Sequence, residues 1–191
     1  MELLVSFGAA AALVFVAELG DKSQLLSLWF ATRYGLWTVL AGVATATVVV
    51  MGVAVVVGAI FGAVLPRTLF LTVAGLLFFV FAAWSLRHEQ EEDEEEEVRA
   101  APAFGAYGIV TVSIVVSEMG DKTQLATVAL AGDRDPVGVW LGATAGMFTA
   151  VAIAVVIGKV AGKRLPHRLI SIGAAVLFAA FGVATLWEAW S

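Results

Sequence analysis

Long runs of Leu, Val, Ala and Phe, separated by short polar segments, dominate the 191-residue chain. The runs lack the strict alternation of a half-buried strand, and they are long enough for the roughly 20 residues that a helix needs to cross a hydrocarbon core. The pattern therefore predicts an all-α integral membrane protein. Its six transmembrane helices are expected over residues 3–30, 37–62, 68–88, 103–131, 137–161 and 168–190.

The two halves of the chain match at an offset of 100 residues without gaps. The matching positions include Gly42 with Gly142, Gly58 with Gly158, Gly62 with Gly162, Leu65-Pro66 with Leu165-Pro166, Leu77-Phe78 with Leu177-Phe178, and Phe81 with Phe181. Three helices are an odd number, so the second unit enters the membrane from the opposite side, which predicts two inverted three-helix repeats (3+3). The expected division is 1–88 for the first repeat, 89–102 for an acidic linker and 103–191 for the second repeat.

Composition agrees with a membrane protein, because 61% of the residues are hydrophobic and only 14% are charged. The mean hydropathy is +0.96. Eight of the sixteen acidic residues lie in the linker segment Glu89–Glu97, where like charges favour an extended, solvated tether. An alternative is that this segment concentrates divalent cations near a transport entrance. The chain has no cysteine, which excludes thiolate metal sites and disulfides.

The basic residues between the helices predict the orientation in the membrane. The second and fourth connections hold only Arg67 and Arg134. The first, third and fifth connections and their flanks hold Arg33, Arg87, Arg99, Lys159, Lys163, Arg164 and Arg168. We therefore expect both termini outside and the acidic linker in the cytoplasm. No feature indicates nucleic-acid binding or a particular oligomeric state.

Two polar motifs interrupt the apolar runs, ELGDKSQ at Glu18–Gln24 and EMGDKTQ at Glu118–Gln124. On a regular helix, with about 100° per residue, each motif presents one charged face. That face is expected to hold Glu18, Asp21, Lys22 and Leu25 in the first copy and Glu118, Asp121, Lys122 and Leu125 in the second. Gly20, Ser23, Gly120 and Thr123 are expected behind it. The two glycines are interpreted either as hinges or, as is more common for small residues in membrane helices, as packing surfaces.

Inverted repeats would bring four carboxylates together near the bilayer centre, those of Glu18, Asp21, Glu118 and Asp121. A charge at that depth costs at least ~2.5–3.5 kcal/mol, so the carboxylates need compensation. Lys22 and Lys122 neutralise two of the negative charges, and the other two match one divalent cation or two protons. Carboxylate oxygens suit calcium and manganese(II).

The remaining polar residues of the motifs have two interpretations each. Gln24 and Gln124 either complete the oxygen shell of the cation or form hydrogen bonds across the interface. Ser23 and Thr123 are either ligands or hydroxyls bonded to the backbone. Lys22 and Lys122 either neutralise the aspartates of their own motifs or act as internal cations that leave when metal enters.

Because a cation and protons would compete for the same carboxylate oxygens, the motifs favour cation/proton exchange by alternating access, without a cofactor. The alternatives are an exporter of a small organic solute such as an amino acid, and a passive cation channel. An enzyme is disfavoured, because the sequence lacks an HExxH motif, a Tyr-Asp partner for Gly-Asp, and arginines at the centres of the helices.

The doubled motif E-x-G-D-K/R-T/S in a small six-helix chain with an acidic central loop resembles a known transporter family. This is the Golgi, bacterial and chloroplast family of calcium or manganese/proton exchangers, which includes the MneA-type bacterial manganese exporters. The resemblance covers essentially the whole chain. It implies that Glu18, Asp21, Glu118 and Asp121 form the cation site. For a chain of bacterial size it implies manganese export across the inner membrane.

Overall fold

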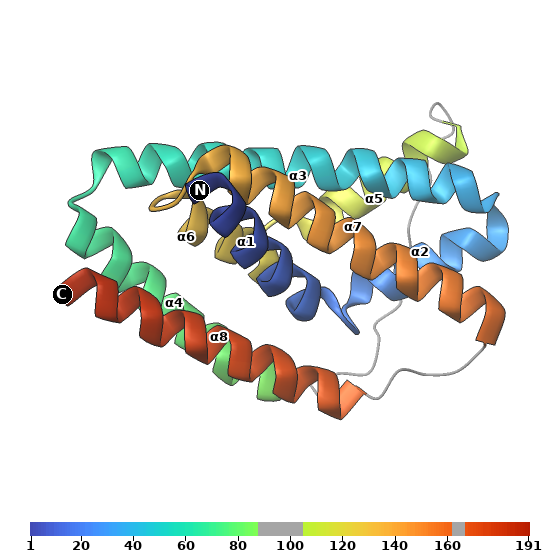
Figure 1. The fold of residues 1–191 in the computed structure, drawn as a ribbon. Helices are drawn as coiled ribbons and strands as arrows, with labels where there is room; N and C mark the ends of the chain where they lie inside the picture. The colour runs from blue at the N-terminus through green and yellow to red at the C-terminus, as the bar shows by residue number, and fades with distance from the viewer. Residues whose placement is uncertain (88–104, 162–166) are drawn as a thin grey trace.

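The computed structural model describes residues 1–87, 105–161 and 167–191, so the acidic linker at 89–102 lies outside the described residues. Every regular element in these ranges is a helix, which confirms the all-α class (Figure 1). The helices are α1 (Glu2–Glu18), α2 (Lys22–Arg33), α3 (Leu36–Val64), α4 (Arg67–Arg87), α5 (Ala106–Glu118), α6 (Lys122–Ala131), α7 (Pro136–Ala161) and α8 (His167–Trp190).

Four of the described helices are long and apolar enough to cross a membrane. Their qualifying segments are Leu36–Val64, Arg67–Leu86, Pro136–Val156 and Ile172–Trp190. Many of their large apolar side chains are exposed, as expected for helices whose outer surface faces lipid. The chain is therefore a membrane protein.

The two expected helices that carry the motifs are each broken, which corrects the predictions for 3–30 and 103–131. Gly20 and Gly120 have φ angles of 76° and 80°, in the left-handed region that residues with a Cβ rarely adopt. Asp21 and Asp121, which precede α2 and α6, have extended backbones with ψ of 160° and 163°. Each motif therefore joins one helix end to a new helix start, and a single regular helical face does not exist there.

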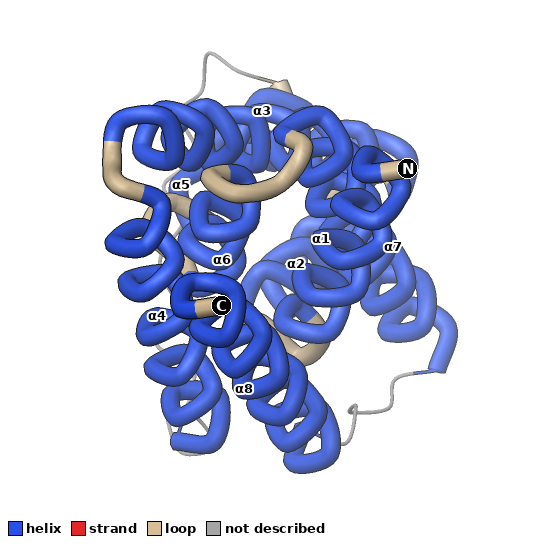
Figure 2. Tube along the Cα trace, turned by 60° about the vertical axis from the view of Figure 1, so that its left-hand side comes forward, coloured by secondary structure: helices blue, strands red, loops and turns tan. Residues whose placement is uncertain are grey.

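The helices of the two halves are interleaved (Figures 1 and 2). Helix α1 packs on α7, and its counterpart α5 packs on α3. Helix α6 contacts α3, and α2 contacts α7 in the same relation. Helices α4 and α8 pack on each other, where Phe78 and Phe178 stack with ring centroids 6.3 Å apart. Neither half buries its apolar surface alone.

Glycines lie where these helices approach most closely. A Cβ added to Gly58 would lie 2.3 Å from the carbonyl oxygen of Val128, and one on Gly142 would lie 2.2 Å from that of Phe7. The neighbouring atoms are backbone and cannot rotate away. These positions therefore let α3 contact α6 and let α7 contact α1 without a spacer.

Gly142→Ala is expected to destabilise the fold, because the new methyl group would overlap the Phe7 carbonyl. Overpacking of this kind typically costs about 1–3 kcal/mol, which lowers the midpoint of thermal unfolding by several degrees. The measurement is thermal unfolding of the purified protein in detergent. Gly8→Ala on α1 is the control, because a Cβ there has no neighbour within 4 Å. Equal midpoints for the two variants would contradict the packing argument.

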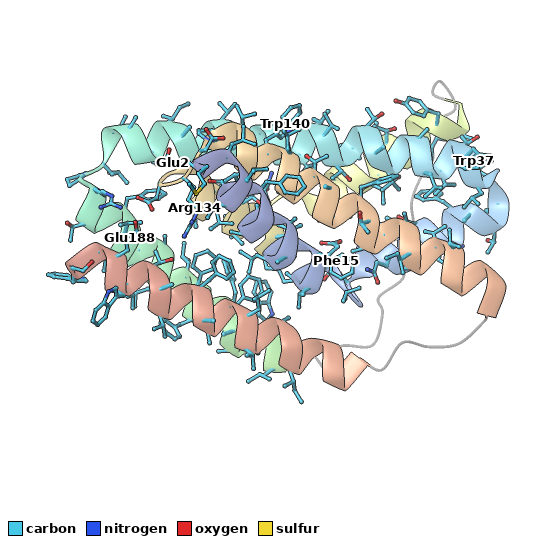
Figure 3. All side chains as sticks on the ribbon, in the orientation of Figure 1. Glu2, Phe15, Trp37, Arg134, Trp140 and Glu188 are labelled. Atoms are coloured by element: carbon cyan, nitrogen blue, oxygen red, sulfur yellow. The ribbon has the colours of Figure 1, made fainter. Side chains whose placement is uncertain are left out.

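One end of the bundle carries ion pairs that connect the two halves. The Arg67 Nε atom lies 3.0 Å from Asp133 Oδ1, and its Nη2 atom lies 2.7 Å from Glu188 Oε1. These contacts join the start of α4 to the α6–α7 connection and to the end of α8. Both termini lie toward this end (Figure 1), and Figure 3 shows Trp37 at the opposite end from Glu188.

Candidate metal centre

Three carboxylates from both halves of the chain converge at the helix breaks. Glu18 ends α1, Asp21 precedes α2 and Glu118 ends α5. One carboxylate oxygen from each lies within 4.8 Å of the others. Glu18 and Glu118 are fully buried, and the Asp21 side chain is 13% exposed. Opposite oxygen ligands of a hard divalent ion are separated by about 4–5 Å, so this spacing fits such an ion.

The two glutamines close the breaks that position the carboxylates. The Gly20 N–H donates to Gln24 Oε1 at 2.9 Å, and the Gly120 N–H donates to Gln124 Oε1 at 2.7 Å. These bonds are local, so the described residues do not show the hydrogen bonds across the interface that were one of the two interpretations of the glutamines. Because each glutamine satisfies a backbone donor freed by the break, the motif supplies its own cap.

The hydroxyl groups of the motifs bond to different carboxylates. Ser23 Oγ donates to Glu18 Oε1, and both groups are buried. The predicted position of Ser23 behind the charged face is therefore wrong, because Ser23 belongs to a new helix whose rotation is set by the break. In the second motif, Thr123 Oγ1 instead donates to Asp121 Oδ2 at 3.3 Å. The two halves of the site are thus in different local arrangements.

Asp121 lies outside the three-carboxylate group. Its Oδ2 atom accepts from the Thr123 N–H at 3.4 Å and so caps the start of α6. Lys122 Nζ donates to Asp21 Oδ1 at 2.7 Å, across the interface between the halves. Lys122 therefore forms an ion pair with the aspartate of the other motif. The side chains of Lys22 and Leu25 lie outside the described part of the structure.

Several oxygens in this group are buried without a hydrogen-bond partner among the described residues. They are Glu18 Oε2, Asp21 Oδ2 and both carboxylate oxygens of Glu118. A buried carboxylate without a donor or a cation is costly. The three carboxylates are accompanied by the one described ammonium group of Lys122, which leaves a deficit of two positive charges. One divalent cation or two protons would fill that deficit, and the oxygen donors suit hard divalent ions.

Sequence reasoning gave too little weight to Gly20 and Gly120. Both were expected mainly to provide packing surfaces, but they form the left-handed turns between Glu18 and Asp21 and between Glu118 and Asp121. The available signal was a glycine followed directly by Asp, a strong N-cap residue. Because the Gly-Asp pairs lie inside long apolar runs, each run was interpreted as one continuous helix.

Comparisons with known proteins identify the family of the chain. The sequence model described as the divalent cation/proton antiporter GDT1 matches residues 6–93 and 106–191. The GDT1-like protein sll0615 of Synechocystis is 32% identical, with 97% of this chain and 98% of the relative covered. A Vibrio cholerae protein named "Putative manganese exporter" is 31% identical, with 90% and 86% covered.

A plant relative shows the same similarity over part of its length. The chloroplastic GDT1-like protein 2 of rice is 32% identical over 95% of this chain, which spans 60% of that relative. No solved structure matches significantly. The family match covers both halves of the chain, including both motifs. The chain belongs to the GDT1 family of divalent cation/proton antiporters.

Proposed function

We propose that the chain crosses the membrane six times, as two inverted three-helix repeats over 1–88 and 103–191, with the acidic linker at 89–102 between them. The broken pairs α1–α2 and α5–α6 each form one crossing, and α3, α4, α7 and α8 form the other four. Two observations support this arrangement. The sequence repeat has no gaps, and the packing of α5 on α3 corresponds to that of α1 on α7 when the two halves are interchanged. Discontinuous helices are typical of the substrate sites of secondary transporters.

The orientation that we propose has both termini outside a bacterial inner membrane and the acidic linker in the cytoplasm. Both termini lie toward the end that holds the α3–α4 and α6–α7 connections. The excess of Lys and Arg lies in the other connections. Trp37 at one end and Trp187 and Trp190 near the other are strongly exposed, which suits anchors at the two membrane interfaces.

The function supported best is export of manganese(II), with calcium as the second choice, in exchange for protons. The observation that carries it is the buried group of Glu18, Asp21 and Glu118, with four unpartnered oxygens among the described residues. Asp121 is the fourth ligand of the proposed site. It joins the other three carboxylates in a state in which the second motif has the same local arrangement as the first. The name of the Vibrio cholerae relative supports manganese as the cargo.

The charge of the site supplies the exchange mechanism. A group with a deficit of two positive charges is costly in the membrane interior, so the site changes its access only when it is filled. Filling by one divalent cation and filling by two protons are equivalent in charge. Movement of the cation in one direction is therefore coupled to movement of protons in the other.

Transport into inside-out membrane vesicles tests the proposal. An acidic lumen should drive uptake of manganese(II), and calcium is compared under the same gradient. Glu118→Gln should lower the uptake by about 100-fold or more, since even groups that only orient metal ligands are worth roughly 10–100-fold. Glu2→Gln, at an exposed glutamate of α1, is the matched control.

Three results would contradict parts of the proposal. Manganese uptake that does not respond to the pH gradient would contradict the proposed exchange with protons. Equal uptake by Glu118→Gln and the wild type would contradict the proposed cation site. Faster uptake of calcium than of manganese(II) at equal concentrations would reverse the order of the two cations.

A further inference from the structure

Ser27 on α2 has a fully buried hydroxyl group with no hydrogen-bond partner among the described residues. Ser85 Oγ and Thr144 Oγ1 are likewise buried without a partner there, but two buried threonine hydroxyls donate to the carbonyl four residues earlier. Thr47 Oγ1 donates to the Val43 carbonyl at 2.8 Å, and Thr127 Oγ1 donates to the Thr123 carbonyl at 2.8 Å. Such bonds satisfy a hydroxyl within its own helix. The Ser27 oxygen is therefore available to another partner.

The position of Ser27 connects it to the carboxylate group. Ser23 and Ser27 are one helical turn apart on the same face, with about 5–6 Å between their Cβ atoms, and Ser23 donates to Glu18. The Nε2 atom of Gln24, between them in sequence, is also buried without a partner in the described part of the chain. A polar path thus continues from Glu18 along α2.

This path points toward the end of the bundle that is cytoplasmic in the proposed orientation. Helix α2 runs from the site to Arg33 and the α2–α3 connection. Beyond Ser27 the buried side chains are apolar, because Phe30 and Ala31 pack in a cluster with Val39 and Val43. Ser27 is therefore the last buried oxygen of α2 before the apolar layer that separates the site from this end.

The corresponding position in the second half is occupied differently. Thr127 lies 100 residues after Ser27. Its hydroxyl contacts both the Thr123 carbonyl of its own helix and Met51 Sδ, the latter at 3.4 Å. Its hydrogen-bonding capacity is used by the protein. At this pair of equivalent positions, the described structure thus shows one hydroxyl without a partner and one that is hydrogen-bonded.

We propose that the Ser27 hydroxyl oxygen is a transient ligand on the cytoplasmic route, where it replaces a hydration water of the divalent cation on its way to Glu18. The proposal rests on the proposed function, since it assigns an entry step to that transporter. An uncharged oxygen suits this role, because it stabilises a partly dehydrated cation without holding it. Ser27 is thus a direct but transient contact for the entering cation.

The test compares manganese(II) uptake into inside-out and right-side-out vesicles for Ser27→Ala, Ser27→Thr and Thr127→Ala. Ser27→Ala should raise the KM at the cytoplasmic face by roughly threefold to tenfold, the effect of one lost neutral oxygen contact. The maximal rate and the KM at the outer face should stay within about twofold. Ser27→Thr, which keeps the hydroxyl, should restore the cytoplasmic KM, and Thr127→Ala should leave it unchanged.

An unchanged cytoplasmic KM for Ser27→Ala would overturn the proposal. Equal increases in KM at both faces, or an equal increase for Thr127→Ala, would also overturn it, because the effect would then be a general change in packing. The wild type and Glu118→Gln are measured in the same vesicles. Transport by the wild type that Glu118→Gln abolishes upholds the proposed function even if the Ser27 result fails.

Discussion

Asp21→Asn is expected to weaken manganese(II) binding by about 100-fold, whereas Asp121→Asn should weaken it by less than about tenfold. Asp21 contributes one of the three clustered carboxylate oxygens and also pairs with Lys122 at 2.7 Å. Asp121 caps α6 and bonds to Thr123. Asparagine keeps the size of the side chain but removes the charge. The difference in manganese(II) affinity between the two variants therefore reports which aspartate belongs to the carboxylate group. Manganese(II) binding is measured on the purified protein by electron paramagnetic resonance.

Glu188→Gln is the control for this experiment, because that glutamate bonds to Arg67 away from the site. Its manganese(II) affinity should equal that of the wild type. Equal losses for Asp21→Asn and Asp121→Asn would contradict the inequivalence of the two motifs. Wild-type affinity for Asp21→Asn would contradict the three-carboxylate group itself.

The apolar pattern predicts four of the helices closely. The expected range 37–62 corresponds to α3 at Leu36–Val64, and 168–190 corresponds to α8 at His167–Trp190. These helices are continuous apolar runs bounded by segments that contain polar residues, Gly or Pro, so local sequence determines both ends. The same reasoning failed at the motifs. It assumed a regular helix, with about 100° per residue, across Gly20 and Gly120, but both glycines adopt a positive φ that ends the helix.

The residue types of the site are predictable from sequence, but their partners are not. Buried acids in a repeated motif indicate a functional site, and Glu18, Asp21 and Glu118 do come together. The pairing of Lys122 with Asp21 depends on how α6 packs beside α1, which no local pattern encodes. The hydrogen bond from Ser23 to Glu18 likewise depends on the direction in which α2 continues after the break.

Gly120→Val is expected to abolish transport, whereas Gly120→Asn should retain a substantial part of it. Gly120 has a φ of +80°, and a Cβ at this position has no neighbour within 4 Å. The effect of a side chain is therefore backbone strain rather than a clash. A left-handed conformation costs an ordinary L-residue roughly 1–2 kcal/mol and a β-branched one more, but asparagine tolerates it. Valine should relieve the strain by changing the turn between Glu118 and Asp121.

The measurements for Gly120 are proton-driven manganese(II) uptake and the thermal unfolding midpoint of each variant. Because the break lies outside the α1–α7 and α3–α5 contacts, Gly120→Val should unfold within a few degrees of the wild type while losing uptake. Loss of uptake by both variants to the same degree would mean that any added atom blocks the site, against the open space at this position. Full uptake by Gly120→Val would show that the left-handed turn is not required to place Glu118.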